Sequence, residues 1–395
     1  MELIYGAQRR INRRLIARPV NASKGPLPGP LVYAGMFQTA SGIGQAANAC
    51  VDLLAEESPT PLIVDLSAAF NQIDVAPLVQ LSPMPKARSG TLILHVNAPE
   101  VEPALQILGM MWPRRWRVIG YWAWELDIAP QKWLPVTRHL SELWTPSPFI
   151  TDTFSPCLSI PVHTVPHYVS VPPFVSRGPS IVPSNVAHHP ISCLVMADGR
   201  SSFERKNLIG AILLFQKAFE DDPAARLVVK TRNLAEFPDI GITLNTFLRN
   251  DHRISLIDET LSSADRWKLL AEADILLSAH RSEGFGLHLA EAMALGKCVV
   301  ATGWSGNMSF MTSENSVLLP YRRVPVDDQF GIYTSTSIAT WADIDIPASA
   351  RLLREIACDA VRRIAIGKQA AKDIATKFGE DQITRTLRAR IQGNT

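Results

Sequence analysis

The stretch HRSEGFGLHLAEAMALGKCVVATGWSGN, residues 280–307, places two carboxylates on either side of a glycine-rich turn that runs into a helix. Glu283 precedes the turn, and Glu291 follows eight residues later. The pattern predicts a helix that begins near Leu287 and ends at Gly296, a residue suited to a C-terminal cap. One acid is therefore expected before the helix and the other on its first turns.

This turn is suited to bind an anion. Gly284 and Gly286 lack the Cβ atom that would keep a ligand away from the backbone. The amides of Phe285, Gly286 and Leu287 lie at the positive end of the expected helix, where a diphosphate fits. Each glutamate can then accept hydrogen bonds from hydroxyls, one on a transferred sugar and one on a ribose. The turn is therefore predicted to hold a nucleotide sugar.

The segment resembles the E-x7-E signature of the family 4 retaining glycosyltransferases, over a run of small residues, acids and glycine. The resemblance is close from about Cys193 to Asn315 and loose in the first half of the chain. It implies an α/β protein with the GT-B fold, in which two Rossmann-like, doubly wound domains face each other across a cleft. It also implies sugar transfer with retention at the anomeric carbon. The simpler alternative is an amphipathic helix with an exposed glutamate at each end.

Length and composition indicate two globular domains. At 395 residues the chain is longer than one hydrophobic core supports, so domains of roughly 170 to 200 residues are expected. The net charge of +2 is too small to indicate a nucleic-acid partner. The five cysteines are dispersed and odd in number, which argues against a disulfide framework or a zinc site and favours the reducing cytoplasm.

No apolar run reaches the ~18 residues that span a bilayer, and the start of the chain lacks the apolar segment of a signal peptide. The first residues do combine apolar side chains with Arg9, Arg10, Arg13 and Arg14. They are interpreted either as a short amphipathic helix at the inner-membrane surface or as a solvated arm. We favour the arm, because charge runs are usually solvated.

Apolar segments alternate with helical ones in both halves of the chain, which is typical of parallel, doubly wound sheets. Strands are expected at residues 31–37, 61–66, 91–97, 117–126, 142–145, 191–198, 226–231, 253–258, 275–280 and 297–302. We expect an acceptor-binding domain at residues 1–169, a proline-rich linker at 170–190 and a nucleotide-sugar-binding domain at 191–379. In the resembled family the last helix, within residues 380–395 here, packs back on the first domain.

The segment GRSSFERKN, residues 199–207, follows the first strand of the second half, where open α/β sheets bind ligands. It resembles the phosphate loop of the same family. Lys206, with Arg205 or Arg200 as its companion, would neutralise the departing diphosphate, and Ser201 would lie beside it. The alternative is a solvent-exposed helix start, although cations are disfavoured at a helix N-terminus.

The loop SGIGQAA, residues 41–47, permits two interpretations. Gly42 and Gly44 follow a strand, and Asp65 ends the next one, which matches a short dinucleotide fingerprint and would indicate an NAD-dependent dehydrogenase. The resembled glycosyltransferases also place a glycine-rich loop here, facing the donor phosphates. The two motifs in the other half of the chain favour the second interpretation.

Four further residues lie near the expected ends of strands. In the resembled family a histidine near the place of His95 lines the sugar site, although a lone histidine is commonly structural. Glu125, in the aromatic segment GYWAWEL, is a candidate for binding the acceptor. Lys230 and Asp258 lie where the nucleobase binds in this fold, and the alternative for both is a salt-bridged rim.

Asp343 and Asp345 form a D-x-D pattern, but the enzymes that this chain resembles use cationic side chains instead of a metal. We therefore expect no metal and no cofactor. The expected reaction is transfer of a hexose from GDP-mannose or a UDP-hexose to a saccharide or lipid-linked acceptor, with bacterial surface polysaccharide synthesis inferred from the resemblance. A sugar phosphorylase or epimerase of the same fold, or a catalytically idle partner of a transferase, remain alternatives.

Overall fold

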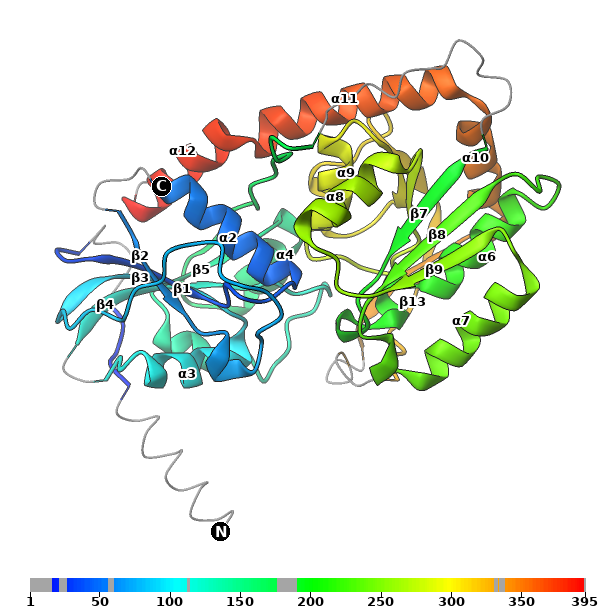
Figure 1. The fold of residues 1–395 in the computed structure, drawn as a ribbon. Helices are drawn as coiled ribbons and strands as arrows, with labels where there is room; N and C mark the ends of the chain where they lie inside the picture. The colour runs from blue at the N-terminus through cyan, green and yellow to red at the C-terminus, as the bar shows by residue number, and fades with distance from the viewer. Residues whose placement is uncertain are drawn as a thin grey trace. The chain divides into compact units, whose positions relative to one another are not determined.

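The computed structural model describes residues 16–20, 27–55, 60–111, 114–175, 190–329, 333 and 338–393. The chain divides into two units, shown in Figure 1. One is formed by Met1–Tyr168 with Glu380–Thr395, and the other by Val169–Gly379. The arginine-rich start of the chain and residues 176–189 of the predicted linker lie outside the described residues.

The first unit contains a six-stranded parallel sheet with the order β2-β1-β3-β4-β5-β6. Its strands are β1 (Leu31–Gly35), β2 (Leu62–Asp65), β3 (Ser89–His95), β4 (Arg115–Tyr121), β5 (Glu142–Thr145) and β6 (Val162–Thr164). Its helices are α2 (Gly42–Leu54), α3 (Ala98–Ile107), α4 (Pro148–Phe154) and α12 (Glu380–Ile391). Every residue of β1 is buried, as expected for a strand covered on both faces.

The strand predicted at residues 117–126 ends at Tyr121, so its second half was predicted wrongly. From Trp122 onward the chain packs as a buried aromatic segment, in which the rings of Trp122 and Trp124 meet Trp133 edge to face at 5.7 and 4.9 Å. The indole N–H of Trp124 donates to the carbonyl of Ile128 at 2.9 Å. A buried irregular segment and a buried strand have the same apolar composition, which is why the pattern did not separate them.

Helix α12 is fixed to the first sheet by one buried arginine. The guanidinium of Arg117 on β4 donates to the carbonyl groups of Ile391 and Arg390 at 2.5 and 2.7 Å. It also pairs with Glu142 at 2.7 Å, although its side chain is only 1% exposed. The last carbonyl groups of a helix receive no hydrogen bond from within the helix. Arg117 donates to two of them and therefore caps the end of α12.

The second unit contains a six-stranded parallel sheet with the order β12-β11-β10-β7-β8-β9. Its strands are β7 (Ser192–Met196), β8 (Arg226–Thr231), β9 (Ile254–Asp258), β10 (Ile275–Ser278), β11 (Cys298–Thr302) and β12 (Val317–Leu319), and an antiparallel pair is formed by β13 (Tyr321–Pro325) and β14 (Thr340–Ile344). Its helices are α5 (Phe203–Lys206), α6 (Leu208–Ala218), α7 (Pro238–Asn250), α8 (Ser263–Glu272), α9 (Leu287–Ala294), α10 (Ile346–Cys358) and α11 (Ala360–Phe378).

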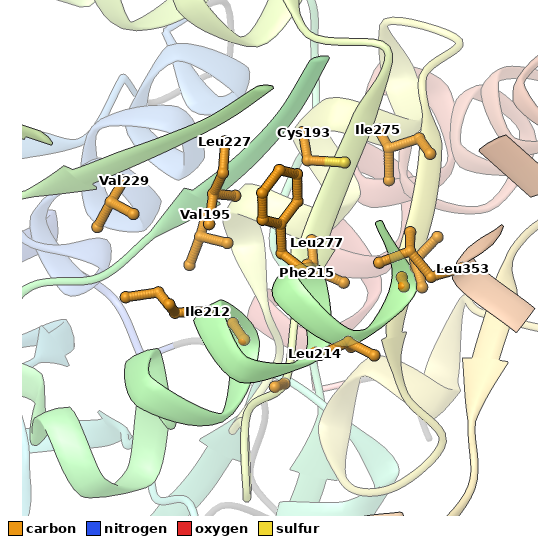
Figure 2. Packing of buried hydrophobic residues seen from close by; sticks show 14 of the residues in the cluster. Cys193, Val195, Ile212, Leu214, Phe215, Leu227, Val229, Ile275, Leu277 and Leu353 are labelled. Carbon is orange, nitrogen blue, oxygen red and sulfur yellow. The ribbon is translucent and has the colours of Figure 1, made fainter. Parts of the chain in front are cut away.

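Two apolar clusters cover the faces of this second sheet. On one face Phe215 and Ile212 of α6 pack against strand residues and Leu353 of α10 (Figure 2). On the other face α8, α9 and α11 supply residues such as Leu270, Leu289 and Ile374. The predicted α/β class with two doubly wound sheets is thus confirmed. Helices α7, α10 and α11 and the β13–β14 pair were not predicted.

Replacing glycine with alanine should have opposite effects at two helical positions of the second unit. A Cβ atom at Gly367 of α11 would lie 2.0 Å from the carbonyl oxygen of Gly296, whereas at Gly241 of α7 the nearest atom is 3.9 Å away. Alanine at position 241 should stabilise the protein by about 0.5–1 kcal/mol, because alanine is the better helix former. Gly367→Ala should destabilise it, because α11 and α9 must move apart. Urea unfolding of both variants measures this, and equal changes in the free energy of unfolding would contradict the packing.

Candidate functional site

Glu283 lies in the turn between β10 and α9, and this turn is held by the segment after β11. The backbone N–H of Glu283 donates to Ser305 Oγ at 2.8 Å, and its carbonyl accepts from the Gly306 N–H at 2.9 Å. A Cβ atom on Gly306 would lie 2.1 Å from the carbonyl oxygen of Gly284, so this approach requires glycine. The residues after β11 therefore determine the shape of the turn that carries Glu283.

Buried polar side chains support the same turn. His280 Nε2 lies 3.1 Å from Asn307 Oδ1, and His280 Nδ1 lies 3.0 Å from Ser278 Oγ. Asn307 also donates to the carbonyl of Thr302 at 3.0 Å. Burial lowers the pKa of His280 to about 4, so this ring is neutral at physiological pH. We interpret His280 as a support of the turn.

Two cations of the segment 199–207, the predicted phosphate loop, bind the Glu283 carboxylate. Lys206 Nζ lies 2.6 Å from Oε1, and Arg205 Nη1 lies 3.1 Å from Oε2. Arg205 also donates to the carbonyl of Ser282 at 2.7 Å. Arg205 and Glu283 are only 3% and 5% exposed, so this is a buried charge cluster. It joins the two motifs that the sequence analysis singled out.

The short helix α5 positions both cations because a cap lies at each of its ends. Ser202, with a φ of 63°, accepts from the Arg205 N–H through its hydroxyl at 3.2 Å. Asn207, with a φ of 50°, ends α5. It also caps the start of α6, because its side chain accepts from the Gly210 N–H at 3.2 Å. Serine and asparagine are favoured caps, and asparagine tolerates the left-handed region.

The charge cluster remains ionised at neutral pH. Burial by itself would raise the pKa of Glu283, but the charges of Lys206 and Arg205 outweigh burial and hold this pKa well below 4.5. Two cations then face one carboxylate, so the cluster carries a net positive charge. Such a cluster next to a helix N-terminus is suited to bind an anion.

Helix α9 begins at Leu287, as predicted, and Gly286 precedes it with a φ of 91°. The N–H groups of a first helical turn have no acceptor inside the helix. The ring of Phe285 is buried and lies 5.1 Å from that of Phe310. At position 285 the backbone N–H, and not the side chain, is therefore the group that can bind the predicted anion.

Glu291 pairs with an arginine that the sequence analysis did not consider. Arg266 of α8 binds both carboxylate oxygens through two nitrogens of its guanidinium, and Nη2 lies 2.9 Å from Oε1. Glu291 is 6% exposed. A carboxylate has about four acceptor positions, so a bidentate arginine still leaves acceptor capacity for ribose hydroxyls.

The other predicted residues of the phosphate loop differ in their placement. Ser201 joins the cluster through its backbone, because its carbonyl accepts from Arg205 Nε at 3.1 Å. Arg200 forms an ion pair with Glu236 at 2.6 Å, and both side chains are almost half exposed. Of the two proposed companions of Lys206, the structure brings Arg205 to the same carboxylate. A donor role for Arg200 stays a prediction.

Lys230 and Asp258 lie at neighbouring strand ends of the second sheet, where they stabilise local structure. Lys230 Nζ donates to the carbonyl groups of Thr231 and Glu259, both at 2.5 Å. Asp258 Oδ1 accepts from the Thr231 hydroxyl at 2.9 Å. Burial lowers the pKa of Lys230. These contacts fit the structural alternative, and a nucleobase role for either residue stays a prediction.

The contacts of Asp65 and of the glycine-rich loop in the first unit do not support the dinucleotide interpretation. Asp65, the acid expected to bind ribose in a dehydrogenase, accepts from the Phe37 N–H at 2.9 Å and from Gln38 Nε2 and Ser67 Oγ at 2.7 Å. Its carboxylate is therefore bound by one backbone N–H and two side chains of the protein itself. Gly42 opens α2, and a Cβ atom there would meet nothing within 4 Å, whereas one on Gly44 would lie 2.4 Å from Thr39.

His95 is enclosed by aromatic side chains of the first unit. Its side chain is fully buried, its Nδ1 lies 2.7 Å from the Tyr33 hydroxyl, and its ring stacks on Tyr121 at 4.1 Å. Burial, and then the charge of His167, lower its pKa well below 6.5. These contacts fit the structural alternative, and a role for His95 at the sugar site stays a prediction. Glu125 is half-buried after β4, and its acceptor role stays a prediction.

The two aspartates of the D-x-D pattern have structural contacts. Asp343 pairs with Arg281 at 3.1 Å, and Asp345 caps α10 by accepting from the Ala348 N–H at 2.9 Å. Within residues that the structure describes, no group of three or more His, Cys, Asp or Glu side chains is placed to hold a metal ion. No helix in the described part of the chain has the length and apolar character needed to cross a membrane.

Residues 222–326 match the family model described as Glycosyl transferases group 1. No curated protein matches the sequence. Anabaena HepE (Alr3699), solved with UDP and glucose, is similar with a TM-score of 0.61 and 13% identity, over 91% of this chain and 98% of that chain. A glycosyltransferase from Rickettsia africae has a TM-score of 0.61 and 12% identity, over 93% of this chain and 100% of that chain.

Two larger proteins share part of their length with this chain. S. aureus TarM, solved with UDP, has a TM-score of 0.54 and 12% identity over 76% of this chain. The chain spans 55% of TarM and 56% of the pneumococcal O-GlcNAc transferase GtfA. At these identities the likeness shows the fold, which is the predicted GT-B fold.

The charge cluster predicts how stability depends on pH. Glu283→Gln removes the anion between the buried Arg205 and the partly buried Lys206 and should cost about 3–5 kcal/mol at pH 7. Because the folded pKa of Glu283 lies below the unfolded value near 4.5, the carboxylate stabilises the fold above pH 4.5. Each pH unit below that value removes about 1.4 kcal/mol until the folded pKa is reached.

Urea unfolding at pH 7 and pH 3.5 measures this dependence, with Glu272→Gln as the control because Glu272 is exposed on α8. The difference in the free energy of unfolding between the wild-type protein and Glu283→Gln should be smaller at pH 3.5 than at pH 7. A difference that is the same at both pH values would contradict the assigned charge state.

Proposed function

We propose that this chain, a group 1 glycosyltransferase with the GT-B fold, moves a hexose from a nucleoside-diphosphate sugar to a saccharide or lipid-linked acceptor. The proposal rests on one observation above all. Lys206, Arg205 and Glu283 form a buried cluster with net positive charge at the N-terminus of α9. Such a site favours the charge that develops on a departing diphosphate.

In the proposed reaction the bond between the anomeric carbon and the diphosphate oxygen breaks, and the acceptor oxygen forms the new bond. Lys206, Arg205 and the first amides of α9 stabilise the negative charge on the leaving diphosphate. The acceptor proton passes to that phosphate. Glu283 accepts a hydrogen bond from a hydroxyl of the transferred sugar. Retention at the anomeric carbon follows from the family resemblance.

Glu291 is proposed to bind the donor ribose, with Arg266 as the residue that positions it. A bidentate arginine fixes the plane of a carboxylate. The remaining acceptor positions of Glu291 would then bind the ribose hydroxyls. The guanidinium of Arg266 thereby offsets the charge of an acid that is buried on α9.

A UDP-hexose is the donor that we favour, and GDP-mannose is the second choice. The support is that HepE, GtfA and TarM were each solved with UDP. A role in bacterial surface polysaccharide synthesis, at the cytoplasmic side of the inner membrane, follows from the family resemblance. Product analysis separates transfer from phosphorolysis, which would consume free phosphate, and from epimerisation, which would form no glycoside.

Glu291→Ala should weaken UDP and UMP binding to a similar extent, by about ten- to hundredfold, because the ribose is common to both. The fold should persist, since this residue contributes little apolar packing. Isothermal titration measures both affinities. If GDP raises the melting temperature of the protein more than UDP does, the titrations are made with GDP and GMP instead. Affinities unchanged for every nucleotide tested would argue against the ribose assignment.

Lys206→Met should weaken binding of the diphosphate more than that of the monophosphate, because its ammonium is assigned to the leaving group. We expect a loss of at least tenfold for UDP and a smaller loss for UMP. Lys217→Met is the matched control, because Lys217 lies on α6 in an exposed ion pair with Glu220. An equal loss for both nucleotides would place the diphosphate away from Lys206.

A further inference from the structure

His288, the second residue of α9, carries a buried ring nitrogen that lacks a hydrogen-bond partner. Among the described residues no donor or acceptor satisfies its Nε2. The residue as a whole keeps part of its surface exposed, although Nε2 itself is buried. A buried polar atom without a partner is costly, and in native proteins such an atom often marks a place that a ligand or water completes.

The surroundings of His288 are charged and favour an anion. Burial lowers the pKa of His288 to about 3, and the charge of Lys206 acts in the same direction. Glu283, His280 and Arg205 are also close enough to influence it. The imidazole is therefore neutral at physiological pH, and one of its two tautomers carries a proton on Nε2.

Three other histidines in the described part of the chain do not share this combination. His280 Nε2 lies 3.1 Å from Asn307 and His139 Nε2 lies 3.2 Å from Glu102, so both nitrogens have partners. His95 Nε2 also lacks a partner, but that residue is fully buried, stacks on Tyr121 and belongs to the first unit. His288 alone in this comparison joins an unsatisfied nitrogen to partial exposure beside the charge cluster.

We propose that His288 Nε2–H donates a hydrogen bond to the terminal phosphate of the donor diphosphate. This inference rests on the proposed function and adds a residue to it. His288 stands on the first turn of α9, whose amides are expected to face the same phosphate. A neutral donor adds a hydrogen bond there without adding another charge beside Lys206 and Arg205. The terminal phosphate distinguishes a diphosphate from a monophosphate, so His288 contributes to the choice of leaving group.

The test is isothermal titration of the full-length protein with UDP and UMP, and with GDP and GMP. His288→Ala should weaken diphosphate binding about ten- to hundredfold, which is the usual effect of losing a hydrogen bond to a charged group. Monophosphate binding should change less than threefold. His288→Gln keeps an N–H donor and should recover part of the loss. His252→Ala is the matched control, because His252 is an exposed histidine before β9.

A second measurement remains informative if His288→Ala lowers the stability of the fold. In uniformly 15N-labelled protein, the imidazole resonance of His288 is the one that is missing from the spectrum of His288→Gln. In the wild-type protein this resonance should shift when UDP is added. It should not shift when UMP is added. This signal reports contact with the phosphate directly, and a purely structural role for His288 would leave it unchanged.

The outcomes separate the two proposals. If the wild-type protein binds no nucleoside diphosphate, the proposed function fails and this inference fails with it. If the wild-type protein binds the diphosphate and His288→Ala binds it equally well, only the inference is overturned. Equal losses for diphosphate and monophosphate would also overturn it, because they would show a general disturbance of α9.

Discussion

The ion pairs of Glu283 with Lys206 and Arg205 are the interactions on which the candidate site depends. They join two segments that lie 77 and 78 residues apart in the sequence. One segment is the short helix α5 after the first strand of the second sheet, and the other is the turn that leads into α9. The hydrogen bonds from Arg205 to the Ser282 carbonyl and from the Arg281 N–H to the Arg205 carbonyl, both at 2.7 Å, join the same two segments.

Burying three charges is costly, and the surrounding structure offsets that cost. The carboxylate has a cation on each oxygen, and Arg205 also satisfies the carbonyl groups of Ser201 and Ser282. The turn itself is fixed from β11 through Ser305 and Gly306. Such buried clusters contribute little net stability compared with apolar packing, so their value lies in placing charge at one defined point. In this chain that point is the N-terminus of α9.

The sequence predicted the parts of this site that are local and missed the parts that are distant. The glycines around Glu283 and the cap at Gly296 carry their own backbone signals, so the beginning and the end of α9 were predicted correctly. The fold class followed from the alternation of strands and helices. Arg266 pairs with Glu291 across 25 residues, and no periodicity marks an arginine on α8 as the partner of an acid on α9.

Other differences have the same physical origin. For His95 the family resemblance implied a place at the sugar site, and the local pattern did not reveal that the residue is buried beside Tyr121 of β4, whose ring also stacks on His167 after β6. His288 was missed because its role depends on an unsatisfied atom, which only three-dimensional contacts show. Asp65 was a possible ribose ligand, whereas its carboxylate accepts two hydrogen bonds from the loop after β1 and one from Ser67, which follows β2.

A crystal structure of the protein soaked with UDP, or with GDP where that nucleotide binds better, tests the central claim most directly. The account predicts a diphosphate within hydrogen-bond distance of Lys206 Nζ and of the first backbone amides of α9. Electron density for the nucleotide at another place, with the Glu283 cluster and the N-terminus of α9 unoccupied, would contradict it.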